Sequence, residues 1–139
     1  MDKKSKQLVR ARAQGCCEYC LSREDYSPDA FSMEHVVPRA VGGNSNVANL
    51  ALACQCCNNH KYNRTHGLDP LTQVLVPLFN PRQDIWQEHF VWLDEYALIT
   101  GITATGRATT AELHLNRASV VNLRRLLVLA DKHPPRLVE

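Results

Sequence analysis

Two cysteine pairs with identical spacing constrain this chain more than any other feature. Cys17-x2-Cys20 and Cys54-x2-Cys57 are separated by 33 residues. A tetrahedral Zn²⁺ takes four thiolates, and each CxxC turn supplies two of them with little strain. The amino-terminal residues are charged and lack the apolar stretch of a secretory signal, which favours zinc over disulfides. The spacing therefore predicts a structural zinc site. Unmetallated core or redox-active cysteines are the alternative.

The other two cysteines have no partner at that spacing. Cys16 and Cys56 are predicted to be small apolar side chains or unengaged thiols. With 139 residues and only 6% aromatic side chains, the chain has a modest core. A metal staple would help such a chain to fold.

Turn and cap residues divide the first half into short elements. Residues 1–15 are predicted to form a basic helix closed by Gly15. A strand is expected to end at Pro38, which cannot continue a ladder. A loop around Gly42-Gly43, the apolar strand 50–54 and a short helix after Cys54 follow.

The second half has a different character. Asn80-Pro81 predicts the start of a helix through residue 90, and a hairpin is expected to turn near Asp94-Glu95. A short helix is predicted over 106–115. Asn116 is predicted to cap a final helix through Asp131, with an apolar stripe formed by Val120, Leu123 and Leu127. Trp86, Phe90 and Trp92 are expected to supply core rather than to stack on bases.

The stretch "CEYC…MEHVVPRAVGGNSNVANLALACQCCNNHK" is similar to the HNH nuclease motif in its zinc-stapled form. The resemblance implies an α+β protein whose core is a ββα-metal, treble-clef-like unit at residues 16–66. Residues 1–15 would be an amino-terminal helix, and residues 67–139 a hairpin-plus-helix extension packed on the core. Residues 79–117 also resemble the tail of uncharacterised bacterial, notably cyanobacterial, HNH proteins.

The residues inside the cysteine bracket suit phosphodiester hydrolysis. His35 is predicted to be the general base, because an imidazole accepts a proton near neutral pH. The resemblance implies that Glu34 and Asn58 hold one Mg²⁺ or Mn²⁺ and that Asn49 bonds the backbone near His35. Glu stands here where Asp is commoner, and Asn stands in the third motif position, which favours a hard cation.

Helical periodicity supports Asn58 over its neighbour as the third motif residue. Lys61 and Tyr62 follow Asn58 at i+3 and i+4 on one face, whereas His60 points elsewhere. His60 and His66 are predicted to be bystanders.

Nucleic acid is the predicted partner, although the net charge is only +2. Residues 1–12 and 117–136 are strongly basic, which suits contact with a phosphate backbone; solvated helix faces are the alternative. The predicted phosphate contacts are Arg39, Lys61 and Arg64, and further candidates on the duplex flank are Arg107, Arg117, Arg124 and Arg125.

The sequence thus predicts a cytoplasmic, divalent-metal-dependent HNH endonuclease acting on double-stranded DNA, with no membrane segment. A catalytically inactive zinc-finger module that binds nucleic acid is the main alternative, and a zinc-stapled protein–protein adaptor is a third. A lone active site makes one nick per engagement, so cutting both strands would need a homodimer or two events.

Overall fold

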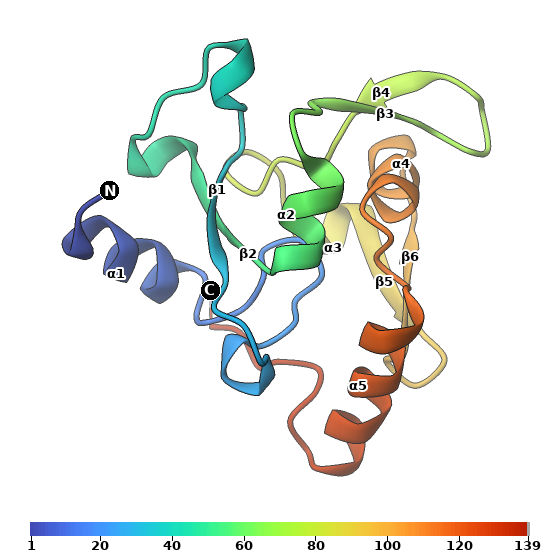
Figure 1. Cartoon of the computed structure of the whole chain (residues 1–139). Coiled ribbons are helices and arrows are strands. Elements are labelled where there is room, and N and C mark those ends of the chain that lie inside the picture. The colour runs from blue at the N-terminus through green and yellow to red at the C-terminus, as the bar shows by residue number, and fades with distance from the viewer. Residues whose placement is uncertain (139) are drawn as a thin grey trace.

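The computed structural model describes residues 1–138 and shows a mixed α+β fold, as predicted (Figure 1). Three two-stranded antiparallel sheets pair β1 with β2, β3 with β4, and β5 with β6. In chain order the elements are α1 (Lys3–Arg12), β1 (Ser32–His35), β2 (Leu50–Ala53), α2 (Gln55–Lys61), β3 (His66–Leu68), β4 (Leu75–Pro77), α3 (Trp86–His89), β5 (Phe90–Leu93), β6 (Leu98–Gly101), α4 (Ala104–Glu112) and α5 (Ala118–Leu129).

The first hairpin and the helix after it form a ββα unit. In the hairpin, Glu34 lies opposite Ala51 and His35 lies opposite Leu50. All four residues of β2 are buried, and α2 packs against β1. The loop between β1 and β2 contains two single-turn 3₁₀ helices, Arg39–Val41 and Val47–Asn49.

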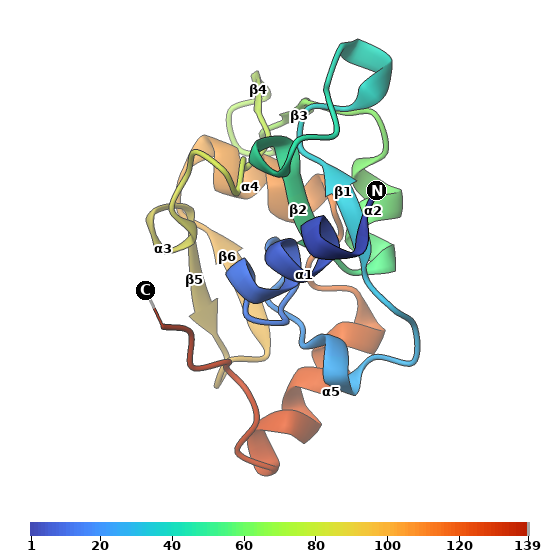
Figure 2. The same cartoon turned by 90° about the vertical axis from the view of Figure 1, so that its left-hand side faces the viewer.

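Helix α1 begins and ends on local hydrogen bonds. The Asp2 carboxylate caps its start by accepting from the Ser5 N–H at 2.7 Å. At its end the C-cap is Ala13, and Gln14 adopts a left-handed φ of +54°. Gly15, with a φ of +71°, donates to the Arg10 carbonyl at 3.1 Å, so the predicted glycine takes part in closing the helix two residues beyond the cap. Arg12 donates to the Leu50 carbonyl at 2.7 Å, which ties α1 to β2 (Figure 2).

One apolar core extends through both halves of the chain. It includes Val9 and Leu50 from the first half and Phe79, Phe90 and Ile99 from the second. The Trp86 indole N–H donates to the carbonyl of Tyr19 at 2.9 Å. Trp86 and Phe90 are buried and Trp92 is partly buried, which agrees with their predicted place in the core.

Two predicted caps of the second half are wrong. Asn80-Pro81 forms a turn, in which the Asn80 side chain accepts from the Arg82 N–H, and the helix begins only at Trp86. The Asn116 amide bonds both backbone groups of Ile99 at 2.8 Å instead of capping α5. The hairpin near Asp94-Glu95 is confirmed.

Helix α5 presents the expected apolar stripe, since Val120 and Leu127 are buried and Leu123 is partly buried. The same face also buries an arginine. Arg124 is 2% exposed and donates to the carbonyls of Ala97 and Leu115 at 3.0 and 2.7 Å. The prediction that Arg124 contacts a DNA duplex is therefore wrong, because its guanidinium donates its hydrogen bonds inside the protein.

None of the described helices combines the length and the apolar composition needed to cross a bilayer.

Replacing Arg124 by Met should lower the free energy of unfolding by about 3 kcal/mol, because it leaves buried carbonyls without a donor. The matched control is Arg125→Met: Arg125 is 53% exposed and pairs only with Asp94. It should stay within about 1 kcal/mol of the wild type. Urea unfolding followed by circular dichroism measures both, and equal effects would contradict the buried role of Arg124.

Candidate functional site

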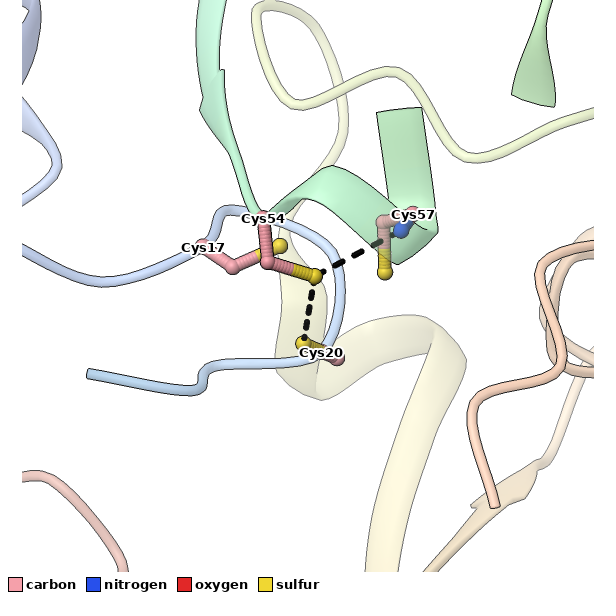
Figure 3. Close-up of side chains that lie close together, drawn as sticks. All are labelled: Cys17, Cys20, Cys54 and Cys57. Carbon is pink, nitrogen blue, oxygen red and sulfur yellow. Dashed lines mark hydrogen bonds between the residues drawn. The ribbon is translucent and has the colours of Figure 1, made fainter. Parts of the chain in front are cut away.

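The two cysteine pairs converge in the buried interior. The sulfur atoms of the four cysteines all lie within 4.8 Å of one another, and Cys20 Sγ is 3.7 Å from Cys54 Sγ (Figure 3). Four thiolates around Zn²⁺, each with a Zn–S bond of about 2.3 Å, would lie about 3.8 Å apart. The set Cys17, Cys20, Cys54 and Cys57 therefore fits a structural zinc ion, as the spacing predicts.

Local backbone geometry builds each half of this site. Leu21 adopts a left-handed φ of +60° and donates to the Cys17 carbonyl, which curls the first CxxC turn. In the second pair, Cys54 occupies the N-cap of α2 and its sulfur accepts from the Cys57 N–H at 3.4 Å. The Glu18 N–H donates to the Leu52 carbonyl and so joins the first turn to β2.

The remaining cysteines lie outside this cluster, as predicted. Cys16 is buried, and burial raises the pKa of its thiol to about 11. Cys56 is exposed on α2. Neither residue belongs to the group of four cysteines whose sulfur atoms converge.

Arg117 lies beside the cysteine cluster. Its Nη2 is 3.5 Å from Cys54 Sγ. Four thiolates bound to Zn²⁺ leave an excess of negative charge, which a neighbouring guanidinium offsets. Arg117 therefore contacts the cysteine site, and its contact with DNA stays a prediction.

An open cleft of about 700 Å³ lies at the edge of the ββα unit and brings several predicted residues together. His35 from β1, Asn58 from α2 and Arg39 from the loop all line it. The cations Lys6 and Arg10 of α1 also line this cleft. The basic amino-terminal helix therefore faces the same space as His35.

The surroundings of His35 favour the neutral form of its imidazole. Partial burial, followed by the nearby charges of Arg39 and Lys61, lowers the pKa of its imidazole below the ordinary value of 6.5. Its Nε2 lies 3.0 Å from the Ser45 hydroxyl. Ser45 was missed from the sequence because a serine in a turn-rich loop carries no signal beyond the turn itself.

Asn49 fastens the loop that follows His35. Its side-chain oxygen accepts from the Val37 N–H at 2.9 Å, and its nitrogen donates to the carbonyls of Val37 and Asn44 at 3.0 and 2.8 Å. Asn49 thus reaches backbone two residues beyond His35. Gly43 lets the loop approach this closely, because a Cβ there would lie 1.7 Å from the Val37 carbonyl oxygen.

The side chain of Glu34 is directed into the protein. It is 4% exposed and forms an ion pair with Lys61 at 2.6 Å. Its second oxygen accepts from the Tyr19 hydroxyl at 2.6 Å. Both carboxylate oxygens are thus engaged, and the pair Glu34 and Asn58 does not fit the predicted catalytic metal site in this arrangement.

Lys61 is correspondingly not a surface cation. It is 2% exposed, so the prediction that it contacts phosphate is wrong. Sequence periodicity placed Lys61 on the face of α2 that carries Asn58, but it could not show that the Lys61 side chain is buried. Tyr19, which completes the contact with Glu34, had no sequence signal other than its position between two of the clustered cysteines.

The other predicted phosphate contacts lie on the surface. Arg39 is exposed beside the cleft. Arg64 is half exposed, but it pairs with Glu112 at 2.8 Å and donates to the His60 carbonyl. The His60 ring lies 4.2 Å from that of His114 and does not line the cleft described above.

Sequence comparison identifies the segment that contains these elements. A sequence model of the HNH endonuclease family matches residues 17–64, from the first zinc cysteine to just beyond α2. The predicted similarity to that family is thereby confirmed. No curated protein and no solved structure matches the chain.

The cysteine cluster leads to a matched pair of substitutions. Cys54→Ser should lose bound zinc and melt at a much lower temperature, because three ligands no longer close the site. Cys56→Ser should keep one zinc ion per chain and a wild-type melt. Elemental analysis and thermal unfolding measure both quantities. Normal zinc content in Cys54→Ser would show that the cluster is not the zinc site.

Proposed function

We propose that the HNH unit at residues 17–64 makes this protein an endonuclease that hydrolyses phosphodiester bonds of DNA, with His35 as general base. The observation that carries the proposal is the position of His35 in an open cleft lined by cations. A phosphodiester is anionic, so a basic cleft attracts it, and the base must meet the attacking water there.

His35 and the residues around it have distinct parts in the proposed reaction. His35 removes a proton from the attacking water, and its lowered pKa keeps the imidazole neutral at pH 7. Ser45 bonds the ring and Asn49 fixes the adjoining loop, so the imidazole keeps one orientation. Arg39 and Lys6 contact non-bridging phosphate oxygens and hold the strand in the cleft.

A requirement for Mg²⁺ or Mn²⁺ is part of the proposal, because the similarity to HNH nucleases implies it. Such an ion would neutralise charge that develops on the phosphate and on the leaving oxygen. The Asn58 amide lies on the cleft and suits a hard cation. Glu34 also lines the cleft, but its two carboxylate oxygens are bound by Lys61 and Tyr19, so the steps assigned above do not use it.

A nucleic-acid-binding zinc module without catalysis is the second candidate. The observation in its favour is the neutralisation of Glu34 by Lys61, which leaves the site without a free carboxylate. A non-catalytic module gives the lowered pKa of His35 no role, and neither does a protein–protein adaptor.

Double-stranded DNA in the cytoplasm is the proposed target. One cleft per chain makes a single nick, and a homodimer would be needed to cut both strands at once.

Loss of His35 distinguishes these functions. We expect His35→Ala to slow relaxation of supercoiled plasmid by about 10²-fold or more, the usual contribution of a general base. His60→Ala is the matched control and should retain wild-type rates, because His60 does not line the cleft. The assay includes Mg²⁺ or Mn²⁺. Equal cleavage by the wild type and His35→Ala would contradict the assignment of His35 as the base. Absence of cleavage by both proteins with Mg²⁺ and with Mn²⁺ would contradict it too.

The pH dependence of cleavage tests the state of His35. Only the neutral imidazole accepts a proton, so kcat/KM should rise with pH and reach half its plateau below pH 6.5, the ordinary value for histidine. The charge of Arg39 contributes to this lowering. Arg39→Gln should therefore shift the midpoint upward whatever it does to DNA affinity. An unchanged or lower midpoint in Arg39→Gln would contradict the electrostatic coupling.

A further inference from the structure

The disagreement between Glu34 and its predicted role as a metal ligand itself points to a function for Lys61. We propose that the Lys61 ammonium is the resident cation of the Glu34 carboxylate, and that this pair positions His35 while excluding a divalent ion from Glu34. The inference rests on the proposed function for the role of His35, but its test does not measure DNA cleavage.

The hydrogen bonds of Lys61 account for its whole donor capacity. An ammonium group has three protons, and three acceptors surround Nζ: Glu34 Oε1 at 2.6 Å, the Val36 carbonyl at 2.8 Å and the His35 carbonyl at 3.3 Å. The contact with Glu34 is short, as expected when both groups are charged. Lys61 therefore has no proton left for an external phosphate.

The other side of the carboxylate is closed as well. Glu34 Oε2 accepts the Tyr19 hydroxyl, and Tyr19 is fully buried between two zinc cysteines. A divalent ion at Glu34 would have to replace an ammonium that already lies in contact with the carboxylate. Glu18, whose charge acts on Glu34, is itself held by Arg82 and by the Leu52 N–H, so a Lys61 displaced from Glu34 would lose its counter-charge inside the protein.

The same contacts explain how Lys61 acts on the imidazole of His35 through the backbone. Lys61 holds the carbonyls of His35 and Val36 from α2. Asn49 holds the backbone of Val36 and Val37 from the other side of the hairpin. The backbone of His35, Val36 and Val37 is thus held by hydrogen bonds to Lys61 and Asn49. Lys61 is in this sense a positioning residue, and Glu34 is the anchor that keeps its charge in place.

Binding of Mn²⁺ to the zinc-loaded protein tests the proposal. Free Mn²⁺ is measured by electron paramagnetic resonance in a titration of wild type, Glu34→Gln, Lys61→Met and the double variant. Wild type and Glu34→Gln should behave alike. Lys61→Met should bind Mn²⁺ about 10-fold more tightly or better, the size of effect seen when the neighbours of a metal site are changed. The double variant should lose that gain.

Two outcomes overturn the proposal. One is a drop of about 10-fold or more in Mn²⁺ affinity on Glu34→Gln alone, which would make Glu34 a metal ligand in the native protein. The other is a folded Lys61→Met protein with no gain in affinity. Both readouts remain meaningful if the protein cleaves no DNA, so failure here and failure of the proposed nuclease activity are separate results.

A second measurement covers the case in which Lys61→Met does not fold. Wild-type protein is treated with an amine acylating reagent, with and without Mg²⁺, and the modified lysines are located by mass spectrometry. Lys61 should remain unmodified under both conditions, while the exposed Lys3, Lys4, Lys6 and Lys132 react. Modification of Lys61 that appears only when Mg²⁺ is added would show that the ion displaces it, and would overturn the proposal.

Discussion

Convergence of four sulfur atoms is the constraint on which the rest of this structure depends. The first pair lies in the turn after α1 and the second begins α2, so joining them closes the hairpin of β1 and β2 between two fixed ends. That closure places His35 at one edge of the hairpin and Asn58 on the adjoining helix. A chain with a modest core can hold a loop as long as residues 36–49 in one shape because its two flanks are fixed.

The sequence was most informative where chemistry demands a fixed spacing. The four cysteines, the ββα order and the shared location of His35 and Asn58 could all be predicted, because ligand geometry and helical periodicity leave few alternatives. The caps proposed at Asn80 and Asn116 failed for a different reason. An asparagine side chain can bond any nearby backbone group. For Asn116 the fold brings Ile99, which is distant in sequence, within hydrogen-bond distance.

Buried cations were the main gap in the sequence prediction. Lys61 and Arg124 were both assigned to DNA, yet each is almost fully enclosed. Long cationic side chains are usually solvated, and their burial depends on acceptors supplied by distant segments. Glu34 for Lys61 and the carbonyl of Ala97 for Arg124 are each more than 25 residues away in the chain. Spacing along one helix cannot show such partners.

The indole bond from Trp86 to the carbonyl of Tyr19 has a consequence for modularity. Tyr19 lies between two of the clustered cysteines, and its hydroxyl donates to Glu34, the residue before His35 in β1. Trp86, in the segment that follows the HNH match, is thus linked to the strand that carries His35 through two hydrogen bonds. The segment that matches the HNH family is consequently not structurally self-contained in this protein. Its inner surface is completed by side chains that follow it in the chain, and grafting residues 17–64 alone onto another scaffold would transfer the ligands without the packing that aligns them.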